Sequence, residues 1–124
     1  MSNATYNGAI SYDVSGTIPK FSLVKLNAAG KIELAGATGA VFGAVTEPGS
    51  LSEDPRVDGN DILAVSFGHV GVKIRTDDEI AAGAAVFAAA DGKAAAEGTV
   101  QVGVAARDSK NGVVITVLNG LPRV

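Results

Sequence analysis

Short valine-rich segments, each bounded by a glycine or a glycine-containing turn, recur along most of the chain. The 124 residues include 16 valines and 16 glycines but no cysteine, so disulfides and thiolate sites are impossible. Valine favours the half-buried surface of a β-strand, and glycine adopts the positive φ angles of tight hairpin turns. The pattern therefore predicts a small all-β domain of short strands. Because its alanine-rich core is thin, we expect a homo-oligomer.

Nine segments between residues 21 and 118 have the composition of strands. Asp91-Gly92 and Asn111-Gly112 predict hairpin turns between neighbouring segments, as does Ala29-Gly30-Lys31. Gly68-His69 either bends one long strand into two or marks a bulge. The predicted strands are 21–27, 31–34, 40–46, 61–67, 70–75, 84–89, 93–96, 100–106 and 112–118.

The alanine-rich segment 79–96 allows two interpretations. Alanine has the highest helix propensity, but Gly83 and Gly92 would each cost about 1 kcal/mol inside a helix. The Asp91-Gly92 turn also falls within the segment. We therefore favour a turn, a strand, a hairpin and a second strand, with a single helical turn near Asp77–Ala82 as the alternative.

The two halves of the chain resemble each other. Val24–Lys31 parallels Val86–Lys93 at an offset of 62 positions, and each segment ends in a Gly-Lys turn. Val41–Val45 then parallels Val100–Val104 at an offset near 60, with Gly43 matching Gly103. A unit that occurs only twice is not a solenoid. It predicts a β-barrel or sandwich with an internal pseudo-repeat.

The N-terminal segment, residues 1–20, differs from the rest because it is rich in serine, asparagine, threonine and glycine. Its larger apolar side chains occupy even positions, the period-two spacing of an extended strand. The segment is either an edge strand of the chain's own sheet or an arm that pairs with another chain. In the second case the anchoring side chains are Ala4, Tyr6, Ile10 and Tyr12.

Several functional classes find no support in the sequence. The net charge is −3, from 10 basic and 13 acidic residues without a basic stripe, so we expect no nucleic-acid binding. No apolar run is long enough to span a membrane, and the N-terminus does not have the pattern of a signal peptide. His69 is the single histidine, and no nucleophile elbow, catalytic triad or calcium loop is present. We therefore expect no enzyme activity, no catalytic residue, no cofactor and no metal site.

The order and spacing of glycines among small apolar residues resemble those of the small capsid decoration (cement) proteins of tailed bacteriophages. The likeness covers roughly residues 21–120, and the loop 47–61 departs from it because it is longer and more acidic. The matching segments are Val41–Thr46, Gly59–Val65, Gly68, Val70–Ile74, Ile80–Val86, Asp91–Lys93, Gln101–Ala105 and Gly112–Leu118.

The resemblance implies a compact β-barrel or β-tulip-like fold, broadly like the lambda-type head decoration proteins. It implies a homotrimer on the outer surface of an expanded head, made in the host cytoplasm. Residues 1–20 would be the arm that contacts the major capsid protein, and residues 21–124 the decoration domain. One alternative is a head-fibre base or a host- or glycan-adhesion module. A second is an enzyme or small-ligand domain with a pocket lined by His69 and carboxylates.

Overall fold

The structure is a computed structural model and describes residues 9–51 and 61–123. Each of the nine predicted segments contains a strand that lies inside its predicted range, and one further strand precedes them. The strands are β1 (Ala9–Asp13), β2 (Ser22–Leu26), β3 (Ile32–Leu34), β4 (Gly43–Val45), β5 (Ile62–Ser66), β6 (Gly71–Arg75), β7 (Ala85–Ala88), β8 (Ala94–Ala95), β9 (Gln101–Ala105) and β10 (Val113–Leu118). The prediction of an all-β domain is thereby confirmed.

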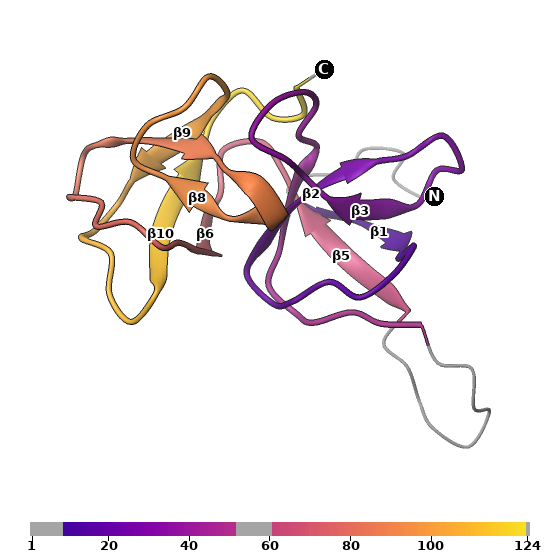
Figure 1. The fold of residues 1–124 in the computed structure, drawn as a ribbon. Helices are drawn as coiled ribbons and strands as arrows, with labels where there is room; N and C mark the ends of the chain where they lie inside the picture. Colours follow the sequence, from indigo (N-terminus) through magenta and orange to yellow (C-terminus); the bar gives the residue numbers. More distant parts are fainter. Residues whose placement is uncertain (1–8, 52–60, 124) are drawn as a thin grey trace, which may run out of the picture.

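The strands form two five-stranded sheets with the same strand order (Figure 1). The first sheet has the order β1-β5-β4-β2-β3, and the second has the order β6-β10-β9-β7-β8. Each strand of the first sheet therefore has a counterpart five strands later in the chain. The chain crosses between the sheets at Gly68 and His69, where the sequence predicts a bend or a bulge. The internal pseudo-repeat is thus a repeat of topology.

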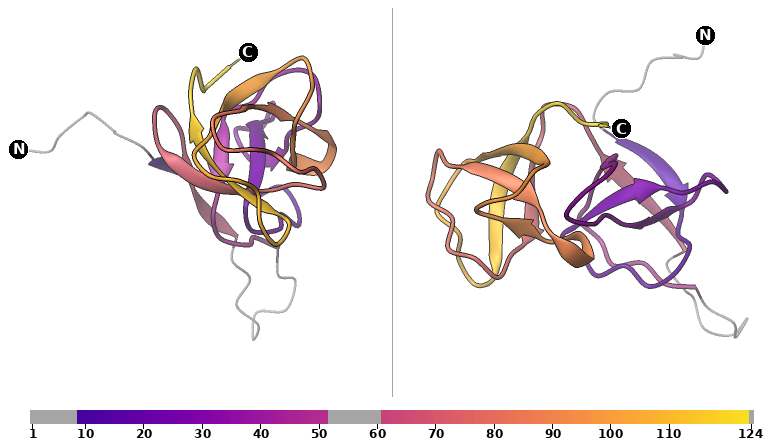
Figure 2. Two further views of the ribbon diagram at one scale, coloured as in Figure 1. Left: turned by 90° about the vertical axis from the view of Figure 1, so that its left-hand side faces the viewer. Right: turned by 45° about the horizontal axis from the view of Figure 1, so that its top comes forward.

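Each sheet curls until its two edge strands meet. Val14, directly after β1, forms a parallel bridge with Ile32 of β3, and Thr76, directly after β6, forms one with Ala94 of β8. Both residues of the second bridge lie 62 positions beyond those of the first, which is the offset found in the sequence. Two views of the ribbon show the curl of both halves (Figure 2). A sheet whose edges meet has the geometry of a small barrel.

Two clusters of buried side chains hold the halves together. The smaller cluster fills the first half and includes Val24 and Val45. The larger cluster fills the second half and also includes Leu23 and Ala44, the neighbours of those residues on β2 and β4. Successive residues of a strand point to opposite faces, so these two strands are buried on both faces. The outer face of the first sheet therefore packs against the second half, and the larger cluster is an interior that both halves share.

The predicted glycine turns take the backbone conformations that their residues favour. Asp91 and Gly92 have φ angles of 60° and 70°, and Asn111 and Gly112 have 55° and 76°. Two successive residues with positive φ are typical of a type I′ turn, whose twist matches that of the flanking strands. The Asp91-Gly92 turn lies in the connection between β7 and β8, and the Asn111-Gly112 turn closes a bridge between Lys110 and Val113 at the start of β10. The alanine-rich segment is accordingly a strand–hairpin–strand, and its short 3₁₀ turn lies at Ala90–Gly92 rather than near Asp77–Ala82.

The structure places part of the N-terminal segment inside the folded body. Residues 9–13 form β1, which pairs antiparallel with β5 along its whole length. Val14 and Ile18 are fully buried, so the core begins well before residue 21, where the sequence analysis put the domain boundary. Exposed side chains alternate with more buried ones along β1, and they alternate in the same way along β5. Pairing within the chain therefore accounts for the period-two spacing. Residues 9–13 therefore form an edge strand of the chain's own sheet, which is the first of the two interpretations.

Candidate functional site

Two of the four side chains proposed as arm anchors lie on β1. Ile10 is opposite Val65 and Tyr12 is opposite Leu63, and both anchors are half-buried. The Tyr12 ring packs edge to face against Phe42, with 5.4 Å between the ring centroids. These two side chains therefore stabilise the first half of the fold. The other two proposed anchors, Ala4 and Tyr6, lie outside the described residues.

The outer edge of β1 presents main-chain hydrogen-bonding groups. The Val14 amide donates to the Asp61 carbonyl on the β5 side at 2.8 Å, while the Ser15 amide turns to Ile32 at 3.0 Å. Main-chain groups of an antiparallel strand alternate between its two sides. The amides and carbonyls of Ser11 and Asp13 consequently point away from β5. Next to Asp13 the Val14–Ile32 bridge joins this side of β1 to β3, so the part around Ser11 is the short edge to which another extended segment could hydrogen-bond.

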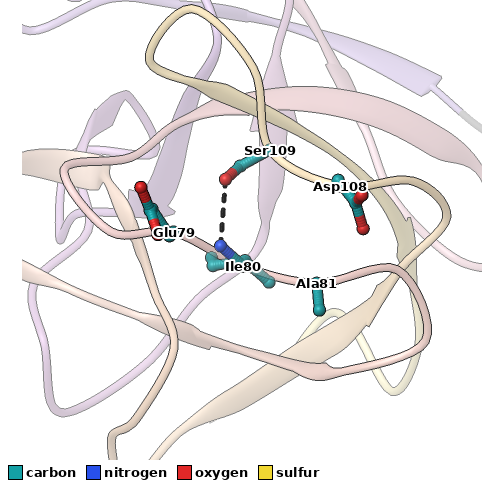
Figure 3. A pocket seen from close by; sticks show the side chains of 5 residues that line it. All are labelled: Glu79, Ile80, Ala81, Asp108 and Ser109. Carbon is teal, nitrogen blue, oxygen red and sulfur yellow. Dashed lines mark hydrogen bonds between the residues drawn. The ribbon is translucent and has the colours of Figure 1, made fainter.

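A pocket of about 400 Å³ lies between two loops of the second half (Figure 3). Ser109 is the only hydroxyl-bearing residue in its lining, and its Oγ accepts a hydrogen bond from the Ile80 amide at 2.9 Å. The Ser109 amide in turn donates to the Ile80 carbonyl at 2.8 Å. Nearby, the Asp108 carboxylate accepts a hydrogen bond from the Ala82 amide at 2.8 Å. These hydrogen bonds join the two loops. Ser109, the serine of this lining, is hydrogen-bonded to the main chain of Ile80.

His69 lies on the crossing between the two sheets. Its Nε2 is 2.9 Å from Oδ1 of Asn119, and the histidine side chain is exposed to solvent. His69 does not line the four pockets, of about 400, 240, 190 and 190 Å³, that the described residues form around the second half. None of these four is therefore the pocket of His69 and several carboxylates that the small-ligand alternative requires.

Residues 9–51 and 61–123 contain neither a cluster of metal-binding side chains nor a helix that could span a membrane. These residues bring together no group of three or more histidine, cysteine, aspartate or glutamate side chains able to hold a metal ion. Across the same ranges, no helix has the length and apolar character that crossing a bilayer would need.

The chain matches no protein-family model and no curated protein.

Sequence reasoning missed one surface, the outer face of the second sheet. β10 reads Val-Val-Ile-Thr-Val-Leu, with apolar residues at nearly every position. A strand with one solvated face alternates apolar and polar residues, whereas a continuous apolar run is typical of a strand covered on both faces. In the structure Val117 points outward and is 42% exposed. The continuous run was the signal in the sequence for this surface.

Proposed function

We propose that the protein is a structural component of a tailed-phage virion that binds the outer surface of the expanded head and stabilises it against internal DNA pressure. The proposal is supported by the resemblance of residues 21–120 to decoration proteins and by an all-β fold without an assembled catalytic group in its described part. The partners would be the major capsid protein and further copies of this chain, as a homotrimer at three-fold sites. No cofactor or chemical step is involved.

The observation that carries the proposal is the position of β1 at a sheet edge. Residues 1–8 lead directly into an edge strand, and their period-two pattern continues in phase with Ile10 and Tyr12. Because those two side chains pack within the chain's own sheet, the anchors left for a partner are Ala4 and Tyr6. An arm of this kind adds a strand to an exposed sheet edge of the capsid, with main-chain hydrogen bonds for affinity and side chains for specificity.

Oligomerisation makes a weak arm sufficient. A trimer presents three arms to a three-fold site, and each arm after the first binds at a high effective concentration. Tyrosine suits the contact because its ring can be buried while its hydroxyl stays hydrogen-bonded. The bound trimer would bridge neighbouring capsid subunits and resist their separation.

The test is co-sedimentation of the purified protein with undecorated, expanded phage heads. Deletion of residues 2–8 removes the arm and leaves β1 in place, so the variant should unfold at the wild-type temperature but no longer bind heads. Tyr6→Ala should weaken binding, whereas the matched control Asn7→Ala, in the opposite phase of the strand, should not. Undiminished binding by the deletion variant would refute the arm mechanism. Failure of the wild type to bind heads, with affinity for cells or glycans instead, would favour the adhesion alternative.

A further inference from the structure

The outer face of the second sheet combines exposed apolar side chains with cations. On β6 the side chains of Val72 and Ile74 are buried, so Lys73 between them points outward. Lys73 is directly opposite Ile115 of β10. Further along β10, Val117 is 42% exposed and pairs with Val104 of β9, which is 38% exposed. An apolar stripe of Ile115, Val117 and Val104 therefore lies across β10 and β9 on the solvent side of the sheet, with Lys73 of β6 beside it.

Three cations lie beside this stripe. Lys73, Arg107 and Lys110 line one hollow of about 240 Å³ together with Val113 and Ile115. Within the described ranges, none of the three cations forms an ion pair. The one carboxylate in the lining, Asp108, is already hydrogen-bonded to the Ala82 amide. We call this surface the basic face and define it as Lys73, Arg107, Lys110, Val113, Ile115 and Val117.

The internal repeat supplies a comparison for the basic face. The pair Lys73–Ile115 on β6 and β10 corresponds to the pair Ser11–Ala64 on β1 and β5. In the same way Val117, paired with Gly71, corresponds to Ser66, paired with Ala9. The same scaffold therefore forms in the first half with small and neutral residues at these positions. Forming the scaffold therefore does not require large apolar side chains there, while the Lys73 cation also has a contact within the fold, since its Nζ lies 5.8 Å from the centroid of the Phe21 ring.

The first sheet carries complementary chemistry at the corresponding end. Asp13 of β1 is opposite Ile62 of β5, an isoleucine that is 56% exposed. Asp61, also exposed, directly precedes Ile62 and accepts the Val14 amide through its main-chain carbonyl. We call Asp13, Asp61 and Ile62 the acidic face. It offers two carboxylates around one apolar side chain, and the basic face offers three cations around an apolar stripe.

We propose that the basic face of one copy binds the acidic face of a second copy, head to tail. The inference rests on the self-association that forms part of the proposed function, and it names the two surfaces involved. Ile62 of one copy packs on Ile115 and Val117 of the next, while the charges orient the contact. A contact between two basic faces would place like charges together, so the interface joins different surfaces. Such an interface leaves both faces available on each copy and produces a closed ring when the rotation permits.

The test is the mass of the full chain in solution by sedimentation equilibrium over a range of concentrations. Wild type should self-associate, and more weakly at about 1 M salt, where the Debye length falls to about 3 Å. Lys73→Glu and Asp13→Lys should each raise the dissociation constant about tenfold or more. An equimolar mixture of these two variants should associate more tightly than either one alone, because each supplies the charge that the other lacks.

Two further variants guard against a trivial loss of folding. Lys31→Glu makes the same charge change at an exposed turn of the first half and should leave the mass unchanged. Ile115→Ala introduces the residue found at the corresponding position 64, so the variant should fold. Its self-association should nevertheless be weaker than that of the wild type. A wild-type protein that remains a single chain at all concentrations would overturn the inference. So would a Lys73→Glu variant that self-associates as strongly as Lys31→Glu. The third refuting result is a mixture of Lys73→Glu and Asp13→Lys that associates no more tightly than either variant alone.

Head binding measured in parallel separates this inference from the proposed function. Self-association through these two faces without binding to heads would refute the proposed function alone. Head binding by a chain that stays monomeric would refute this inference alone. The same holds if the chain binds heads and its self-association is unchanged by Lys73→Glu and Asp13→Lys.

Discussion

Replacement of Gly103 by alanine should be among the most destabilising single-methyl additions that this fold allows. A Cβ atom at this position in β9 would overlap the carbonyl oxygen of Val117 on β10 and approach Thr116 Cγ2 to 2.9 Å. The obstructing oxygen belongs to the backbone of a central strand, so it cannot turn aside as a flexible side chain could. Overpacking of a well-packed interior typically costs about 1–3 kcal/mol, and a rigid obstacle places Gly103→Ala at the upper end, near 3 kcal/mol.

The structure provides a matched control for this prediction. Gly71 also lies in a strand, has no positive φ, and has no atom within 4 Å of the place where a Cβ would stand. Gly71→Ala should therefore leave stability unchanged or raise it by about 0.4–1 kcal/mol, because alanine restricts the unfolded chain. Gly43 of β4 corresponds to Gly103, and a Cβ there would overlap the Ser66 carbonyl oxygen. Gly43→Ala should therefore be destabilising to a similar extent.

The measurement is urea and thermal unfolding of the four proteins, followed by far-ultraviolet circular dichroism. At roughly 4 °C per kcal/mol for a domain of this size, Gly103→Ala should melt about 12 °C below wild type. A Gly103→Ala variant within about 0.5 kcal/mol of both wild type and Gly71→Ala would show that β9 and β10 do not approach each other as closely as described. A large loss for Gly103→Ala with none for Gly43→Ala would instead refute the structural equivalence of the two halves at this position.

Three further substitutions test individual contacts of the fold. Leu23→Ala should cost about 2–5 kcal/mol in urea unfolding, because Leu23 is fully buried where the first sheet meets the second half; a loss below about 1 kcal/mol would contradict the shared interior. Arg75→Met should cost about 1–3 kcal/mol by the same assay, because Nη2 donates to Ser22 Oγ of the first half at 3.0 Å and to the Asp91 carbonyl of the second half at 2.7 Å; wild-type stability would show that neither bond stabilises the fold. Within the second half, Lys93→Ala should change stability by less than about 1 kcal/mol, because its partner Asp77 at 2.9 Å is 77% exposed; a larger loss would assign that ion pair a structural role.

Strand positions could be predicted from this sequence because local signals agree with one another. Valine-rich segments alternate with turns such as Asn111-Gly112, whose residues accept the positive φ angles that a hairpin needs. The repeat was also visible, because matching glycines recur at nearly constant offsets. The sequence could not show why positions 43 and 103 need glycine. The cause is the close approach of a carbonyl oxygen of the neighbouring strand, which depends on strand pairing and not on local sequence.

Sheet order and the use of outer surfaces lay beyond the local signals. The alternating apolar and polar side chains of residues 9–13 are equally compatible with an edge strand of the same chain and with an arm on another chain, because both have one apolar side. Pairing of β1 with β5 joins segments about 50 residues apart, with the loop 47–61 between β4 and β5. Lys73, Arg107 and Lys110 are also separated in sequence, and only the curl of the second sheet brings them to one hollow. The basic face therefore emerges from the fold rather than from any motif.

The two halves distinguish residues that the scaffold requires from residues that it merely tolerates. Where the edges of each sheet meet, a hydroxyl side chain donates to the matching carbonyl in both halves, Ser15 Oγ to Ile32 at 2.9 Å and Thr76 Oγ1 to Ala94 at 2.8 Å. The two donors occupy neighbouring rather than matching positions, since Thr76 corresponds to Val14. The close approach of the central strands likewise keeps a glycine in both halves. The pair Ser11–Ala64 and its counterpart Lys73–Ile115 project from the outer faces of their sheets, where Lys73 Nζ also lies 5.8 Å from the centroid of the Phe21 ring. Differences between the halves at such outward-facing positions are the ones that a binding surface would produce, and the second half concentrates them around Lys73.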